Sequence, residues 1–335
     1  MGLLGAGLVA GQSGAGAGKS ERSIVAVVNH GQATDDDGAG RPEVVGSMVD
    51  RTMLAFTGKE TVEEAWAGLV SADDVVGIKV NVRGGPRMST QPCVVASIVA
   101  GLQAVGVKEQ NILIWDAWNR ELPPAGYAIN ESDQGIRCYG SDRGVHTTGT
   151  RLGRDELRKK VGEHYSDRPV KVADREVFFT RIIEEEITAL INVPLIKDHR
   201  IAGLTCSMKN HYGSILNPSD LHGNACDPYL AALNATPPIR DKTRLILVDG
   251  LRGLYNGGPR DKPQWRFRPN CIVAGTDPVA IDSYALEVLE RERKEKGMPP
   301  LGPRVRYLAT AAEMGVGQIN PEQIEFREVD LTPAT

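Results

Sequence analysis

One segment of the chain, residues 192–226, is unusually rich in side chains that can bind metals or exchange protons. It holds half of the six histidines and two of the five cysteines, with glycines, lysines and an asparagine among them. Nitrogen and sulfur ligands next to point charges are typical of a reactive or metal-binding loop. The polar residues concerned are Lys197, His199, Cys206, Lys209, Asn210, His211, His222 and Cys226.

The three histidines of this segment suggest a site for one divalent metal ion. His211 and His222 would be two of the ligands, and His199 or Cys226 would be the third. Asp116, from elsewhere in the chain, would add a carboxylate. The spacing matches no standard zinc signature, and a single histidine more often has a structural role. The metal site is therefore a hypothesis beside a purely structural interpretation.

Lys197 and His199 are the first candidates for catalysis. They are two residues apart just after an apolar run, so in an extended chain both side chains point to the same side. Together they can hold a carboxylate or phosphate group, or act as acid and base. Lys209 and His211 form a second candidate pair in the sequence Lys-Asn-His-Tyr-Gly. The alternative interpretation is that these residues form solvated polar turns.

Four apolar, β-branched runs predict the strands that position these candidates. Runs of this length suggest strands covered on both faces, as in a parallel sheet. The predicted strands are residues 75–81, 111–116, 189–194 and 244–249. In open α/β sheets, ligands bind beyond the carboxyl ends of the strands. We therefore expect the polar residues at these ends to face one crevice: Asn81, Asp116, Asp249, Lys197 and His199.

Lys79 lies inside the first of these strands, two residues before Asn81, and so points to the same side. A lysine in an apolar run is costly unless it is paired or has a function. We predict that Lys79, Asn81, Asp116 and Asn210 bind the ligand. Asp116 and Asp249 have an alternative role as turn-forming carboxylates that cap the next element.

Helical patterns alternate with the predicted strands. Residues 91–105 have apolar positions at helical spacing, with Pro92 in the first turn and Thr90 as the expected N-cap. Two more helices are expected at residues 278–293 and 305–314, the first of them capped by Asp277. This alternation predicts an α/β fold with a mainly parallel sheet flanked by helices.

Residues 122–170 are polar, irregular and rich in glycine. We interpret them as a polar insertion that leaves the sheet, as a lid or an edge hairpin. The chain contains no low-complexity linker and no internal repeat. We therefore predict that residues 23–335 form a single α/β domain.

The composition excludes several classes of function. The net charge of −4 gives no basic surface for nucleic acid, and 5% aromatic residues are few for stacking platforms. The cysteines are widely spaced, and no Cys-x-x-Cys occurs, so we expect no iron–sulfur cluster. An exported protein of this kind has room for one disulfide. Cys93, Cys138, Cys206 and Cys271 are expected to be small core residues.

Residues 1–22 are interpreted as the remnant of an export signal. The run from Gly2 to Ala10 is apolar and rich in small residues, and it is too short to span a bilayer. Because a basic start is missing, we expect the sequence to be truncated, with a twin-arginine segment upstream. A disordered tail of a cytoplasmic protein is the alternative. No transmembrane segment is expected.

Several motifs, taken in order, resemble the family named domain of unknown function 362. They are Val-Gly-Ile-Lys-Val-Asn at 76–81, Asn-Val-Pro-Leu-Ile-Lys-Asp-His at 192–199, Gly-Leu-Thr-Cys-Ser-Met-Lys-Asn-His-Tyr-Gly at 203–213, Asn-Gly-Gly-Pro at 256–259 and Gly-Thr-Asp-Pro-Val-Ala-Ile-Asp at 275–282. The form Lys-Asn-His-Tyr-Gly followed by Asn-Pro-Ser-x-Leu-His-Gly-Asn is similar to the exported, twin-arginine branch. The resemblance implies an α/β fold and no settled activity. Many members carry an iron–sulfur module, for which this chain lacks clustered cysteines.

These observations favour an exported α/β enzyme, periplasmic or extracellular, that acts on a small anionic ligand. The lysines and asparagines would hold the anion, His199 or His211 would exchange protons, and a divalent metal on His211 and His222 would assist. One alternative is a non-catalytic periplasmic protein that binds a metal ion or a small anion. Another is a structural or assembling surface protein.

Overall fold

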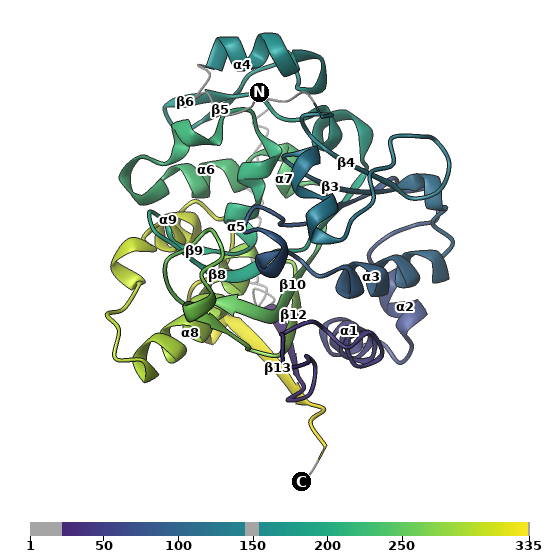
Figure 1. The fold of residues 1–335 in the computed structure, drawn as a ribbon, viewed down its shortest axis with the longest axis vertical. Helices are drawn as coiled ribbons and strands as arrows, with labels where there is room; N and C mark the ends of the chain where they lie inside the picture. The colour runs from purple at the N-terminus through teal and green to yellow at the C-terminus, as the bar shows by residue number, and fades with distance from the viewer. Residues whose placement is uncertain (1–21, 145–153, 334–335) are drawn as a thin grey trace, which may run out of the picture.

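We describe the protein from a computed structural model that covers residues 22–144 and 154–333. Figure 1 shows a central sheet with helices on both sides. The predicted export segment lies outside the described residues, apart from Arg22, and residues 145–153 lie outside them too. In the described part of the chain, no helix is long and apolar enough to cross a membrane.

The central sheet has eleven strands, and most of its strand pairs are parallel. Its order is β13–β1–β12–β10–β7–β2–β3–β4, with β8, β9 and β11 joined beside β10. The strands are β1 (Ser23–Asn29), β2 (Val76–Lys79), β3 (Ile112–Asp116), β4 (Arg137–Gly140), β7 (Ala189–Asn192), β8 (Leu195–His199), β9 (Gly203–Thr205), β10 (Thr243–Leu254), β11 (Arg266–Phe267), β12 (Cys271–Gly275) and β13 (Ile324–Asp330). The predicted α/β class with a mainly parallel sheet is confirmed.

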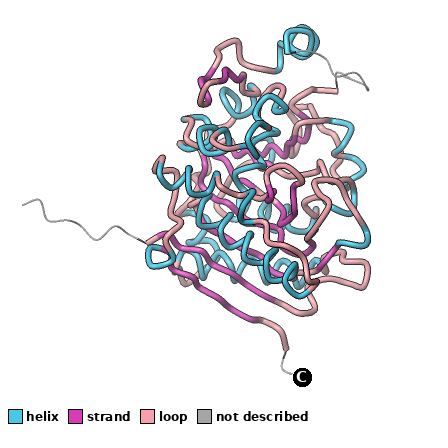
Figure 2. Tube along the Cα trace, turned by 90° about the vertical axis from the view of Figure 1, so that its left-hand side faces the viewer, coloured by secondary structure: helices cyan, strands magenta, loops and turns pink. Residues whose placement is uncertain are grey.

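Helices cover both faces of the sheet because its strands are apolar on both faces. Val76 and Ile78 of β2 belong to one core, which also holds apolar residues of α1 (Pro42–Thr57), α2 (Val62–Ala67) and α3 (Pro92–Ala104). Leu113 and Trp115 of β3 belong to the core on the other face. That second core contains residues of α5 (Ser207–Asn210), α6 (Tyr229–Asn234), α7 (Pro237–Arg240), α8 (Pro278–Glu295) and α9 (Tyr307–Glu313). Figure 2 shows these layers from the side.

The predicted helices are present, with one change in capping. The helix expected at residues 91–105 is α3, but its N-cap is Gln91, not Thr90. The Gln91 amide donates to the carboxylate of Asp249, at 2.7 Å. Asp277 caps α8 as expected, because its side chain accepts the amides of Val279 and Ala280. The third expected helix is α9, which is shorter than predicted.

One part of the polar region at residues 122–170, which we expected to leave the sheet, is a strand of it. Within it, β4 pairs in parallel with β3 and forms the edge strand. This strand has only four residues, too few to give a strand pattern that stands out from the surrounding loop. The same region also contains α4 (Arg154–Val161), and the separate hairpin of β5 (Val170–Val172) and β6 (Arg175–Val177) follows it.

The strand predicted at residues 244–249 continues to Leu254, so Asp249 does not mark its end. Gly250 looked like a turn residue, but it lies within the strand. A Cβ at Gly250 would come within 2.5 Å of the sulfur of Cys271 on the neighbouring strand. Glycine is therefore present there because of close packing, and not because of a turn.

The order of the strands reverses between β2 and β7. From β2 the chain continues through β3 to β4 on one side, and it then returns to β7 on the other side. Such a switch point is where open α/β sheets bind ligands, beyond the carboxyl ends of the strands. Lys79 pairs in register with Asn192 of β7 and with Trp115 of β3, so all three lie side by side at this end. The residues before Asn192 and Lys79 are apolar, which buries this row.

Candidate functional site

A buried ion pair between Lys79 and Asp116 lies at the carboxyl ends of β2 and β3. The Nζ of Lys79 donates to Oδ1 of Asp116 at 2.6 Å and to the carbonyl of Val80 at 2.8 Å. Asp116 also accepts the amides of Val82 and Ala117, each at 2.7 Å. Burial lowers the pKa of Lys79, and the charge of Asp116 opposes that shift. This pair is saturated with hydrogen bonds, which is how a protein tolerates buried charge.

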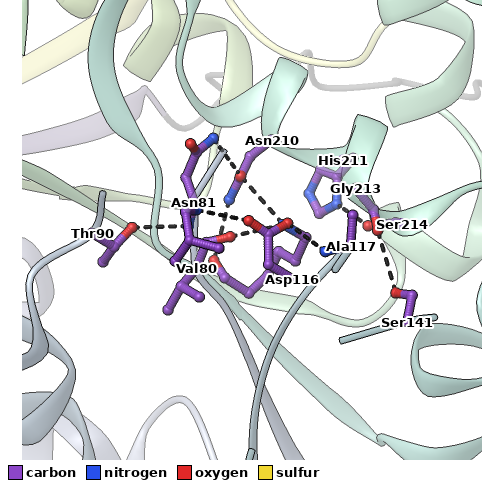
Figure 3. Close-up of polar contacts among 12 residues, drawn as sticks. Val80, Asn81, Thr90, Asp116, Ala117, Ser141, Asn210, His211, Gly213 and Ser214 are labelled. Atoms are coloured by element: carbon purple, nitrogen blue, oxygen red, sulfur yellow. Dashed lines mark hydrogen bonds and ion pairs between the residues drawn. The ribbon is translucent and has the colours of Figure 1, made fainter. Parts of the chain in front are cut away.

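Three asparagines connect this pair to a second buried lysine. Asn210, from α5, donates to Oδ1 of Asn192 at 2.7 Å and accepts from Nδ2 of Asn81 at 3.0 Å. The Oδ1 of Asn81 accepts a 2.7 Å hydrogen bond from Nζ of Lys197. The backbone amide of Asn81 donates to Thr90. Figure 3 shows Asn81, Asn210 and Asp116 converging. A continuous polar network therefore joins β2, β3, β7, β8 and α5.

Lys197 and Lys209 are buried without a carboxylate partner. Lys197 is fully buried, and its only hydrogen-bond acceptor among the described residues is the neutral amide of Asn81. Neither lysine forms an ion pair with a described Asp or Glu. Burial lowers the pKa of Lys197 to about 8, and it has the same effect on the pKa of Lys209. The edge therefore has two buried cations that no carboxylate contacts directly, although the charges of Asp116 and Glu121 attract Lys197 through space.

Lys209 lies among aromatic, histidine and thiol groups. Its Nζ is 3.3 Å from Nε2 of His222, 3.7 Å from the sulfur of Cys226 and 3.7 Å above the centre of the Tyr212 ring. Nδ1 of His222 is 3.0 Å from the carbonyl of Pro218, so this nitrogen carries the proton. Nε2 of His222 is then free to accept from the lysine. Burial lowers the pKa of His222 to about 4, and Lys209 adds to that shift.

His199 is held as a neutral hydrogen-bond donor. Its Nδ1 accepts the backbone amides of Ile201 at 3.2 Å and Ala202 at 3.1 Å, which leaves the proton on Nε2. Its ring centre is 5.6 Å from that of His222. Burial, followed by the charge of Lys209, lowers the pKa of His199 to about 2. His199 can therefore donate to an anion but is a poor base.

His211, a predicted catalytic residue and metal ligand, instead has both ring nitrogens occupied. Nε2 is 3.3 Å from Nδ2 of Asn192, an amide group that also donates to the carbonyl of Ser207. Nδ1 is 3.2 Å from the hydroxyl of Ser214. Burial lowers the pKa of His211 to about 3. In this arrangement His211 locks α5 onto β7, and it offers no free nitrogen.

The metal hypothesis finds no ligand set in the part of the chain that the structure describes. No three His, Cys, Asp or Glu side chains are grouped there to hold a metal ion. His211 and His222, the two expected ligands, have separate partners, and Cys226 contacts Lys209. All five cysteines are free, and Cys206 is buried in the core as expected.

Asp249 does not join the network that the other strand-end residues form. Its carboxylate accepts the amides of Gln91 and Leu251, so it holds the start of α3, as the alternative interpretation proposed. Burial raises the pKa of Asp249 to about 6. Asn81, Asp116, Lys197 and His199 do lie at the predicted edge. The prediction of one polar edge therefore has a single exception among its five residues.

The residues of the polar network all lie within a segment that matches a known protein family. The model of the family described as domain of unknown function (DUF362) matches residues 76–287, which include every residue of the polar network. The chain belongs to the DUF362 family. The twin-arginine branch of DUF362 is a finer assignment that this match does not make.

Other comparisons add little to the DUF362 assignment. No curated protein matches the chain. The crystal structure of a protein from Thermotoga maritima is 10% identical, with a TM-score of 0.41, and the match covers 82% of this chain. The chain spans 60% of the length of that protein.

Sequence reasoning missed several residues of the network within the DUF362 segment. Asn192 and Ser214 orient His211, and Tyr212 lies under Lys209. A Cβ at Gly213 would lie 2.6 Å from Oδ1 of Asp116 and 2.8 Å from Nζ of Lys79, so only glycine fits there. The detectable signal was position, because Asn192 is the one polar side chain of the third predicted strand, residues 189–194, and lies near its end.

Proposed function

We propose that the protein is an enzyme that binds a small anionic ligand at the carboxyl edge of its sheet and exchanges a proton with it. The supporting observation is that Lys197 and Lys209 are buried without a carboxylate partner. A buried ammonium is costly unless an opposite charge accompanies it. A bound anion would supply that charge, and it would raise the lowered pKa of both lysines.

The neighbouring groups define separate roles in this proposal. His199 donates a hydrogen bond through Nε2 and stays neutral, since its Nδ1 is held by two amides. Lys209 exchanges the proton, because its pKa of about 8 lies close to neutral pH. The saturated Lys79–Asp116 pair and Asn210 position Asn81, which orients Lys197. No step requires a metal ion.

A non-catalytic binding protein is the main alternative, and the two functions separate in one experiment. The protein is incubated in D2O with acetate, glycolate and pyruvate. Proton NMR follows deuterium incorporation at the carbon next to the carboxylate in acetate and glycolate, and at the methyl group in pyruvate. An enzyme of the proposed kind incorporates deuterium into at least one probe, and Lys209→Met abolishes that reaction. A binding protein incorporates none, although the same probe raises its melting temperature.

Lys197→Met is expected to stabilise the unliganded protein and to weaken its response to anions. At neutral pH the wild type carries a buried ammonium whose pKa is lowered from 10.5 to about 8, a cost of about 3 kcal/mol. Methionine fills the same space without charge. In thermal unfolding with acetate, glycolate or phosphate, the wild type should be stabilised by about 3 kcal/mol at a hundredfold excess over Kd. Exposed Lys108→Met is the control, and an unchanged anion response in Lys197→Met would contradict the proposal.

We also propose that the protein is exported, as in the twin-arginine branch of its family. The apolar, small-residue run from Gly2 to Ala10 supports this, together with the extended motif around His211 and His222. The test is cell fractionation of the product of the complete reading frame. Recovery of all of the protein in the cytoplasm would refute export and leave the proposed ligand site unaffected.

A further inference from the structure

Arg252 is a third cation that the protein buries without a carboxylate in direct contact. It lies on β10, three residues beyond Asp249, and only 9% of its surface is exposed. Its Nε is buried and has no hydrogen-bond acceptor. Among the described residues, no side chain or carbonyl forms a hydrogen bond, an ion pair or an aromatic contact with this guanidinium. Buried polar groups almost always have a partner, so this exception needs an explanation.

Three further arginines surround Arg252, and they increase its need for an anion. The charges of Arg87 and Arg266 repel that of Arg252. Arg268 is also close, because a Cβ at Gly38 would meet Cδ of Arg252 at 2.9 Å and Cδ of Arg268 at 3.9 Å. A cluster of four guanidinium groups with one of them buried is unfavourable unless negative charge balances it.

The carboxylates of this region are already engaged elsewhere. Asp261 forms an ion pair with Arg266, and Asp37 pairs with Arg87 at 3.6 Å. Asp249 attracts Arg252 through space, but both of its oxygens accept backbone amides, from Gln91 and Leu251. None of the three forms a hydrogen bond or an ion pair with Arg252. No described residue therefore accepts a hydrogen bond from the N–H donors of Arg252, of which Nε is buried.

We propose that Arg252 is the centre of a second anion site, which receives an oxyanion such as a phosphoryl or carboxylate group. Two oxygen atoms of such a group can accept paired hydrogen bonds from one guanidinium. The site would be formed by β10, the Gly38 loop, the segment carrying Arg87 and the β11 segment carrying Arg266. A ligand there would replace the hydration that Arg252 loses on burial.

This site is distinct in its residues and in its chemistry from the site around Lys197 and Lys209 at the carboxyl edge of the sheet, which we call the lysine edge. The lysines are point charges beside histidines, whereas Arg252 recognises a planar pair of oxygens. No hydrogen bond links Arg252 to Lys197, Lys209 or the asparagines of the network. The proposal of a second anion site can therefore be tested independently of the proposed function.

The test removes the lysine edge first, so that the two sites cannot be confused. The variant Lys197→Met/Lys209→Met is the background, and isothermal titration calorimetry measures its affinity for inorganic phosphate and for acetate. One phosphate or one acetate ion should bind. Adding Arg252→Met should weaken that binding at least tenfold, and Arg252→Lys should give an intermediate loss because it keeps the charge and loses the fork. Exposed Arg51→Met is the matched control, with no change expected.

Comparison of the two probes identifies the ligand class, since a phosphoryl site favours phosphate and a carboxylate site favours acetate. Arg252→Met should also raise the melting temperature without anion, because it removes a buried Nε without an acceptor and the repulsion of Arg252 by Arg87 and Arg266. Two results would overturn the proposal: absence of binding by the background variant, or equal binding with and without Arg252. An unchanged anion response in Lys197→Met would refute the proposed function and leave this inference intact.

Discussion

Asp116→Asn is expected to lower the free energy of unfolding by about 3–5 kcal/mol. The substitution leaves the ammonium of Lys79 buried without its counter-ion. It also turns an acceptor into a donor, because one position of the carboxamide would be an NH2 group facing the amide of Val82 or that of Ala117. The variant therefore loses an ion pair and at least one backbone hydrogen bond. Urea unfolding at pH 7, compared with the wild type, measures the loss.

The contribution of the pair itself requires a double-mutant cycle. Lys79→Met should cost less than Asp116→Asn, because Asp116 keeps its two backbone donors after the lysine is removed. If the charges interact as the 2.6 Å contact indicates, the cost of the double variant should fall short of the sum of the single costs by more than 1 kcal/mol.

Glu121→Gln is the matched control for this cycle. It breaks the Arg83–Glu121 ion pair, in which the arginine side chain is 47% exposed, and should cost under about 1 kcal/mol. A loss at Asp116 no larger than this control would show that burial adds nothing to the pair.

The edge where these groups meet could be predicted from the sequence because it depends on local pattern. Asn81 and Asp116 each follow an apolar run, and parallel strands place such ends together. The position of Lys79 inside its run also indicated a paired or functional lysine, and the structure pairs it with Asp116. These inferences required only strand periodicity and the direction of the strands.

The roles of individual histidines could not be predicted, because they depend on contacts between distant segments. His211 is fixed by Asn192 of β7 and by Ser214, and which nitrogen each partner occupies follows from the path of the chain around α5. A histidine with two free nitrogens and a histidine with none look the same in sequence. The density of ligand-type residues predicted both a polar site and a metal, and among the described residues the structure has the polar network but no three grouped metal ligands.

Arg252 illustrates the same limit for electrostatics. It follows a run that looked like the end of a strand, and nothing in its local sequence distinguishes it from an exposed arginine. Its burial results from the continuation of β10 to Leu254 and from the Gly38 loop beside it. Which charged residues are buried away from solvent can be seen only in the folded structure.

Acidification is expected to destabilise the protein through His211 by up to about 5 kcal/mol. Burial holds the pKa of His211 at about 3 in the folded state, against about 6.5 in an unfolded chain. Below pH 6.5 the imidazole of His211 binds a proton in the unfolded chain but stays neutral in the folded protein. The stability contributed by the neutral ring is therefore complete above pH 6.5 and is lost as the pH falls toward 3.

Other groups must be separated from this effect. His199 and His222 act in the same direction as His211, with pKa values of about 2 and 4 in the folded protein. Asp249 and Asp282 act in the opposite direction, since burial raises both pKa values to about 6 and the folded protein binds their protons first. Between pH 6 and pH 4 the unfolded chain therefore binds about one proton more at these five groups than the folded protein does. The free energy of unfolding then falls by roughly 1.4 kcal/mol for each pH unit of acidification.

Comparison of wild type and His211→Gln isolates the contribution of one ring. Glutamine does not titrate, so the stability advantage of the wild type over the variant should shrink by about 3 kcal/mol between pH 6.5 and pH 4. Urea unfolding at a series of pH values measures this difference. Ser214→Ala is the control, because it removes a partner of the ring and keeps the titrating group. A pH-independent difference between wild type and His211→Gln would mean that the ring titrates equally in both states, and that His211 is not the buried lock between α5 and β7.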